Sequence, residues 1–227
     1  KEAQDNGYAE HNPEADVEGY DACRKIAILA SLNYGKTVDY KEIYTEGISR
    51  ITKEDFDYAG LMKKSIKLLG FCREEQGKRY AMVAPFLLDE EHPLYSVRGV
   101  FNGILVHGNM VDDVVFIGRG AGKLPTASAV VSDIIEEARN IGKASGICWT
   151  DEKLTLNDKA ELKFRYMVRM SGNAATSKFR DVFPGAEELD AEILAGEYAF
   201  VTGEMTEGEF LEKYATLSGT IKFIRIR

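Results

Sequence analysis

Apolar positions along residues 21–33 recur at the spacing of one face of an α-helix. Gly35 follows this stretch, and a glycine is the residue that most often ends a helix. We therefore expect a helix over residues 21–33 that buries one apolar stripe. The stripe would consist of Ala22, Ile26, Leu29 and Ala30.

A second helical pattern begins at residues 52–55, Thr-Lys-Glu-Asp, which resemble a capping box. It predicts a helix that runs to Leu69 and is stopped by Gly70. The apolar stripe of this helix would consist of Phe56, Ala59, Ile66 and Leu69.

The pattern then changes to that of strands. Residues 80–88, 102–110 and 113–118 are short runs rich in β-forming residues, with Asp112-Asp113 at an expected turn. A long amphipathic helix follows, over residues 121–142, with Pro125 near its first turn. Its apolar face consists of Ala127, Val130, Val131, Ile134, Ala138 and Ile141.

The last third of the chain separates from the rest by composition. Residues 143–160 are rich in Ser, Gly, Asp, Lys and Asn, and we expect them to form a linker. Beyond the linker, residues 161–227 predict a ferredoxin-like βαββαβ unit. Its expected elements are strand 162–170, helix 174–183, strand 187–194, strand 197–202, helix 206–217 and strand 220–227. The whole chain is thus expected to be α+β, with a first domain over residues 1–142.

Composition excludes several classes of protein. The chain has 227 residues and a net charge of −8, and 44% of its residues are hydrophobic, which is enough to bury a core. The acidic balance argues against a nucleic-acid partner, and no apolar run is long enough for a membrane span. The three cysteines, Cys23, Cys72 and Cys148, are few and far apart. We therefore expect neither a disulfide framework nor a metal site, with Cys23 and Cys148 as buried thiols in a reducing cytoplasm.

The chain begins at Lys1, and residues 1–7 have the pattern of the last turns of a helix closed by Gly7. One interpretation is a fragment whose N-terminal part has been removed. The other is an artificial start followed by a frayed tail. We expect the fragment.

An acidic loop over residues 8–19 carries Glu10 and Asp16, and Asp21 and Lys25 follow it at i, i+4 spacing on one helix face. The simpler interpretation of the last two residues is a surface ion pair worth roughly 0.3–0.5 kcal/mol. The other is a compact polar pocket for a zwitterionic amino acid. In such a pocket a carboxylate would hold the ammonium group and the lysine could transfer a proton.

Residues 3–25 resemble the homoserine dehydrogenase signature. The matching features are Gly-aromatic-x-Glu, a proline, Asp-Val-x-Gly-x-Asp, and a lysine four positions later. Residues 118–133, Gly-Arg-Gly-Ala-Gly-Lys-Leu-Pro-Thr-Ala-Ser-Ala-Val-Val-Ser-Asp, are similar to the glycine turn and returning helix of that family. The segments 83–85 and 97–102 fall where its substrate-domain strands and linking segments fall. His11-Asn12 departs from the more usual Ala-Asp. The resemblance extends over residues 1 to about 142, and it implies a substrate domain built on a mixed sheet.

The resemblance implies reduction of L-aspartate 4-semialdehyde to L-homoserine with NADH or NADPH, a step in threonine, methionine and isoleucine biosynthesis. It implies that Lys25 is the general acid and base and that Asp21, beside it, orients the ammonium group and the substrate oxygen. It further implies that Glu10 contacts the ammonium group of the substrate, with Asp16 and Tyr8 in the same pocket.

The same resemblance implies that Gly120 and Gly122 approach the nicotinamide of NAD or NADP closely, since glycine has no Cβ. From the residues alone, a plain turn before a helix is the favoured explanation of both glycines. The family begins with a dinucleotide-binding domain, and no strand–Gly-x-Gly-x-x-Gly–helix unit occurs in this sequence. We therefore expect this chain alone to be inactive, and the sequence leaves the preference between NAD and NADP open.

Residues 161–227 resemble an ACT domain, which implies a possible amino-acid effector. Residues 170–173, Met-Ser-Gly-Asn, depart from the Asp and Pro-Gly that many such domains carry there, so structural pairing is an equal alternative. The resemblance also implies a homodimer that forms through residues 102–110 and 113–118. Two other functions remain open: a non-catalytic amino-acid-sensing or assembly module, and an acidic α+β domain without a site.

Overall fold

The computed structural model describes residues 12–143, 146, 149–189 and 193–227. The predicted helical turns before Gly7, the candidate residues Tyr8 and Glu10, and the thiol of Cys148 lie outside the described residues.

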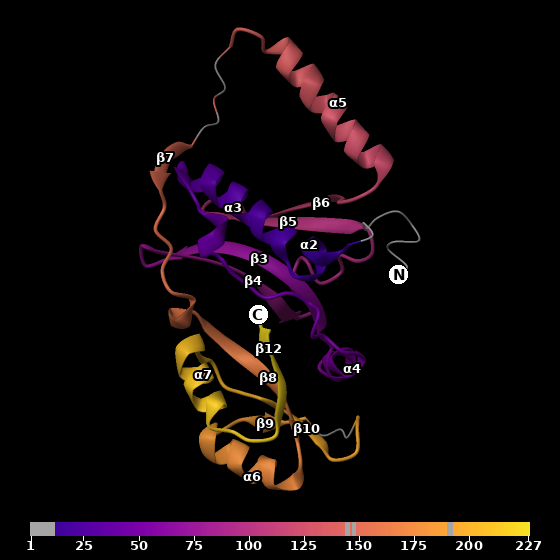
Figure 1. The fold of residues 1–227 in the computed structure, drawn as a ribbon, viewed down its shortest axis with the longest axis vertical. Helices are drawn as coiled ribbons and strands as arrows, with labels where there is room; N and C mark the ends of the chain where they lie inside the picture. Colours follow the sequence, from indigo (N-terminus) through magenta and orange to yellow (C-terminus); the bar gives the residue numbers. More distant parts are fainter. Residues whose placement is uncertain (1–11, 144–145, 147–148, 190–192) are drawn as a thin grey trace.

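One eight-stranded sheet organises the chain (Figure 1). Its strand order is β2-β4-β12-β8-β10-β9, with β3 paired to β4 and β11 paired to β8. The central strand β4 is parallel to β2 and β12 and antiparallel to β3, so the predicted mixed sheet is confirmed. The strands are β2 (Tyr44–Thr45), β3 (Ser65–Glu75), β4 (Lys78–Leu88), β8 (Lys163–Ser171), β9 (Glu187–Glu188), β10 (Glu197–Val201), β11 (Met205–Thr206) and β12 (Thr220–Ile226).

Two two-stranded sheets and the helices complete the fold. The small sheets pair β1 (Lys36–Thr37) with β7 (Thr150–Lys153) and β5 (Phe101–Gly108) with β6 (Asp112–Arg119). The α-helices are α2 (Glu14–Val17), α3 (Tyr20–Tyr34), α4 (Lys53–Leu61), α5 (Lys123–Arg139), α6 (Asn173–Val182) and α7 (Glu207–Ala215). The predicted helices over 21–33 and 121–142 are confirmed as α3 and α5. The hairpin β5–β6 is also confirmed, except that its turn precedes Asp112 and both Asp112 and Asp113 belong to β6.

The prediction of one helix from residue 52 to Leu69 was wrong. The predicted capping box is present, but α4 ends at Leu61, and Lys63 adopts the left-handed region with φ of 53°. Residues 65–75 then form β3, because their apolar side chains serve both faces of a sheet rather than one stripe of a helix. Leu69 and Phe71 pack on one side of the sheet, and Leu68 and Cys72 pack against α3 on the other.

Gly70 therefore does not stop a helix. It lies inside β3, where a Cβ would be only 3.3 Å from the Ala22 carbonyl oxygen of α3 and 3.4 Å from the Ile26 Cβ. A glycine in a strand often marks such a close approach of another backbone. The turn from β3 to β4 is made by Gln76 and Gly77, both with positive φ, as a tight hairpin requires.

The C-terminal part has the predicted βαββαβ order, with the short β11 added before α7. Its strands lie in the order β12-β8-β10-β9, and all neighbours are antiparallel. The helices α6 and α7 lie at the lower end of Figure 1. The buried aromatic core includes a Tyr166–Phe210 stack with ring centroids 3.6 Å apart.

Part of the expected linker is integrated into the first half of the chain. β7 is parallel to β1, and Leu154 is buried in the cluster beneath α3. The two halves also share the large sheet, because β12 is parallel to β4, with Arg225 opposite Phe86.

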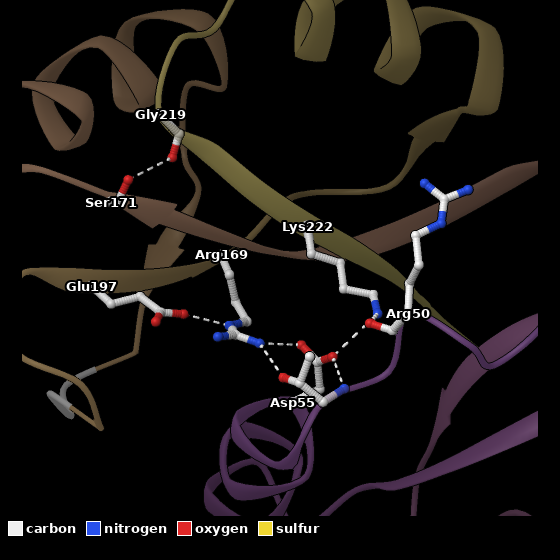
Figure 2. A network of polar contacts seen from close by, with 8 residues as sticks. Arg50, Asp55, Arg169, Ser171, Glu197, Gly219 and Lys222 are labelled. Carbon is white, nitrogen blue, oxygen red and sulfur yellow. Dashed lines mark hydrogen bonds and ion pairs between the residues drawn. The ribbon is translucent and has the colours of Figure 1, made fainter.

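A network of buried charges also connects the two halves of the chain (Figure 2). Arg169 of β8 donates to Asp55 of α4 at 2.5 Å and to Glu197 of β10 at 2.5 Å. Lys222 of β12 pairs with the other oxygen of Asp55 at 3.2 Å. The side chains of Arg169, Asp55 and Glu197 are all buried, so each charge depends on its partners for compensation.

The helix α5 extends away from the rest of the chain and has no buried residue (Figure 1). Its predicted apolar face is open, with Val131 53% and Ile134 61% exposed. The β5–β6 hairpin also exposes large apolar side chains, among them Phe116. No helix among the described residues is both long enough and apolar enough to span a bilayer.

Candidate functional site

Helix α3 positions the main candidate residues. Its inner face carries Cys23, Ala27 and Ala30, which are buried against β3 and β4. Gly19 caps the helix with φ of 78°, and a Cβ there would be 3.2 Å from Val83 of β4. Because this face is fixed on the sheet, the opposite face of the first turns points to solvent.

Asp21 and Lys25 lie on that outer face, as their spacing predicted. The Lys25 Nζ is 2.6 Å from an Asp21 carboxylate oxygen. The side chains are 54% exposed for Lys25 and 45% for Asp21, so the pair stands open for a further ligand. An acid four residues before a lysine on an exposed helix contributes little stability by itself.

Asp16 lies one turn earlier in the chain. The expected loop over residues 8–19 contains the short helix α2, and Asp16 is an exposed residue of it. Its carbonyl oxygen accepts from Gly19 N at 3.3 Å, which closes the turn between α2 and α3. Asp16, Asp21 and Lys25 therefore belong to two consecutive helices joined by one tight turn.

That turn rests on residues that the sequence did not single out. Ile48 N donates to the Val17 carbonyl oxygen at 2.7 Å. A Cβ at Gly47 would overlap this carbonyl oxygen and lie 2.5 Å from the Glu18 Cα. The isolated glycine after Glu46 was the available signal, because glycine permits such backbone-to-backbone contact.

The glycine turn lies between β6 and α5. Gly120 N donates to the Val100 carbonyl oxygen at 3.0 Å, and a Cβ on Gly120 would be 2.6 Å from the Asn102 Oδ1. Gly122 precedes α5 with φ of 120°, a conformation that side chains rarely adopt. Among the described residues, no hydrogen bond or ion pair joins this turn to Asp21 or Lys25. The same residues contain no cluster of His, Cys, Asp or Glu that could hold a metal ion.

Comparisons with known proteins agree with this arrangement. The family model "Homoserine dehydrogenase" matches residues 1–135. The homoserine dehydrogenase of Bacillus subtilis is 43% identical, over 62% of this chain and 33% of its own length. That of Helicobacter pylori is also 43% identical, over 75% of this chain and 40% of its own length.

Solved structures extend the similarity to the whole chain. A homoserine dehydrogenase from Thiobacillus denitrificans matches with a TM-score of 0.81 at 28% identity, covering 100% of this chain and 57% of that one. The Staphylococcus aureus enzyme at pH 6.0 matches with a TM-score of 0.77 at 30% identity, covering 58% of its own chain. The chain thus spans a third to two fifths of these curated relatives and somewhat over half of these solved chains. Because the family model covers more than half of the chain, and the α3 pair and the glycine turn lie inside it, the chain belongs to the homoserine dehydrogenase family.

Proposed function

We propose that this chain supplies the substrate-binding and proton-transferring part of a homoserine dehydrogenase, which reduces L-aspartate 4-semialdehyde to L-homoserine. The observation that carries the proposal is the Asp21–Lys25 pair, 2.6 Å apart on α3 and within the part of the chain that matches the family. An ammonium group held on a fixed helix and open to solvent can donate a proton to a substrate oxygen that docks beside it.

In this proposal Lys25 protonates the aldehyde oxygen during reduction and takes the proton from the homoserine hydroxyl in the reverse direction. Asp21 fixes the Lys25 ammonium group and orients the substrate oxygen. Asp16 contributes to the same polar pocket, and Glu10 and Tyr8, which lie outside the described residues, would hold the substrate ammonium group. The charges match a zwitterionic amino acid, since carboxylates attract its ammonium group.

A bound NADH or NADPH would supply the hydride that adds to the aldehyde carbon. The family resemblance assigns Gly122 to the approach of the nicotinamide, and its φ of 120° is a separate, conformational reason for glycine at this position. The space beside Gly120 is taken by the Asn102 side chain, so Gly120 has a local packing role as well. The part of the relatives that this chain does not match would bind most of the dinucleotide.

We also propose that two copies associate through the β5–β6 hairpin. The hairpin exposes Phe101, Ile104, Val106 and Phe116 by 43–60%, more apolar side chain than an isolated two-stranded sheet keeps in water. An interface of about 1,600 Å² would be of ordinary size. Sedimentation should give twice the mass of one protomer, and a monomer at all micromolar concentrations would contradict the proposal.

We also propose an ACT-like regulatory unit and a cytoplasmic location. The βαββαβ order of residues 163–226 supports an ACT-like unit, and binding of an amino-acid effector there stays a prediction. Cys23 and Cys72 are free thiols, which suits a cytoplasmic enzyme.

Homoserine oxidation tests the proposed function. We use "full-length protein" for this chain together with any further segment that its gene encodes. The full-length protein should reduce NAD or NADP when homoserine is added. Residues 1–227 alone should not, because in this proposal most of the dinucleotide binds to the part of the relatives that this chain does not match. Homoserine-dependent reduction by residues 1–227 alone would show that the division of the site is wrong.

A further inference from the structure

Arg225 is a fully buried cation at the centre of a second charge network. This β12 residue binds Glu207 of α7 with two nearly parallel hydrogen bonds, from Nε at 2.8 Å and from Nη2 at 2.9 Å. Lys159 Nζ approaches the same carboxylate at 2.6 Å. Burial opposes the ionisation of Glu207, but Arg225 and Lys159 together hold the pKa of its carboxyl below the usual value. The paired geometry fixes the guanidinium plane.

The third nitrogen of the guanidinium group, Nη1, contacts a residue in the first half of the chain. Arg225 Nη1 donates to Glu46 Oε2 at 2.7 Å, and the Tyr44 hydroxyl donates to the same oxygen at 3.2 Å. Glu46 N donates to the Val83 carbonyl oxygen at 2.8 Å and continues the pairing of β2 with β4. Glu46 is therefore fixed through its backbone by the sheet and through its side chain by Arg225.

The next two residues touch the candidate site. Gly47 packs against the backbone of Val17 and Glu18 with no room for a side chain. Ile48 N holds the Val17 carbonyl oxygen at 2.7 Å. Val17 is the last residue of α2, and Glu18 begins the turn to α3, so the segment 46–48 supports the turn that joins the two helices.

We propose that Arg225 is a positioning residue of the substrate site: by fixing Glu46 it holds the segment 46–48 against the α2–α3 turn, and thereby sets the places of Asp16, Asp21 and Lys25. The inference rests on the proposed function. With this role for Arg225, the C-terminal unit would contribute to substrate binding even without a bound amino-acid effector.

The Arg169 network provides a matched control within the same protein (Figure 2). Arg169 is also a buried arginine of the large sheet, its side chain is 4% exposed against 1% for Arg225, and it also binds two carboxylates. In the first half of the chain it donates to Thr52 and Asp55 at the start of α4 and lies over the ring of Tyr58, also of α4, away from the α2–α3 turn. The two arginines therefore differ mainly in the segment of the first half that each one binds. Arg225 binds Glu46, next to the segment that supports the α2–α3 turn, and Arg169 binds the start of α4.

The test compares Arg225→Lys with Arg169→Lys in the full-length protein. Both variants keep the positive charge and lose the guanidinium fork, so both should lower the midpoint of urea unfolding. Arg225→Lys should also lower kcat/KM for homoserine about 10- to 100-fold, as expected for a displaced binding site. The KM for NAD or NADP should stay unchanged, and Arg169→Lys should leave both constants close to those of the parent. Equal kinetics in the two variants would overturn the proposal.

Two further measurements keep the test decisive. If Arg225→Lys does not fold, Glu46→Gln replaces it, because Glu46 is partly exposed and the amide preserves its shape; its kcat/KM for homoserine should fall in the same way. If the parent protein itself oxidises no homoserine, the proposed function fails, and amide hydrogen exchange over residues 17–23 still tests the positioning. Exchange there should be faster in Arg225→Lys than in Arg169→Lys, and equal exchange would overturn the inference.

Discussion

Replacing Lys25 with alanine in the full-length protein should lower kcat for homoserine oxidation by about 10²–10⁴, the usual contribution of a positioned acid or base. The KM for homoserine should change less, because the substrate's own charged groups would still be held by other residues. The physical reason is that the Lys25 ammonium group, fixed 2.6 Å from Asp21, is the proposed source of the proton. Steady-state kinetics with homoserine as the varied substrate measures both constants.

Lys213→Ala is the matched control for this prediction. Lys213 pairs with Glu209 four residues earlier, also at 2.6 Å on an exposed helix face, so the two substitutions remove the same kind of ion pair. Lys213→Ala should leave kcat within about 2-fold of the parent, since a surface pair contributes little energy. If Lys25→Ala behaved like Lys213→Ala, another group would have to be the proton donor.

Removing Arg169 should produce a large loss of stability. Arg169→Ala leaves the carboxylates of Asp55 and Glu197 buried with less compensation, which should lower the free energy of unfolding by about 3–5 kcal/mol. Lys222 remains beside Asp55 and should keep the loss near the lower end of that range. Urea unfolding followed by circular dichroism measures the change, and the midpoint should fall with little change in slope.

Arg180→Ala provides the comparison. Arg180 pairs with Glu188 at 2.5 Å, but its side chain is 61% exposed, so water can solvate the carboxylate that remains. The free energy of unfolding should change by less than about 1 kcal/mol. Similar losses in both variants would mean that the Arg169 network does not hold the two halves of the chain together.

The elements that the sequence predicted well are those with one dominant period. Helices α3 and α5 both repeat apolar residues at helical spacing, so each was located to within a few residues. The stripe predicted for α3 was partly wrong, because Leu29 is 38% exposed and the buried face carries Cys23, Ala27 and Ala30. Strand β3 was missed because both of its faces are partly covered, and Ile66 and Leu69 happen to continue the spacing of the preceding helix. The positive φ at Lys63, which ends α4, has no signature in residue type.

In the candidate site, too, local contacts could be predicted from the sequence and long-range contacts could not. Asp21 and Lys25 could be paired from their spacing, because i, i+4 neighbours on one helix are close by construction. The contact of Arg225 with Glu46 joins residues 179 positions apart and depends on the parallel pairing of β12 with β4. Local sequence patterns carry no information on such a contact. The role proposed for Arg225 at the α2–α3 turn could therefore not be predicted from the sequence.

A crystal structure of the full-length protein with homoserine bound would show whether Lys25 is placed to transfer the proton. The homoserine hydroxyl oxygen should lie within about 2.6–3.2 Å of the Lys25 Nζ, which is hydrogen-bond distance for proton transfer. The substrate ammonium group should face the carboxylates near the start of α3. Homoserine bound with its hydroxyl directed at another residue, and with Lys25 left paired to Asp21 in solvent, would contradict this role of Lys25.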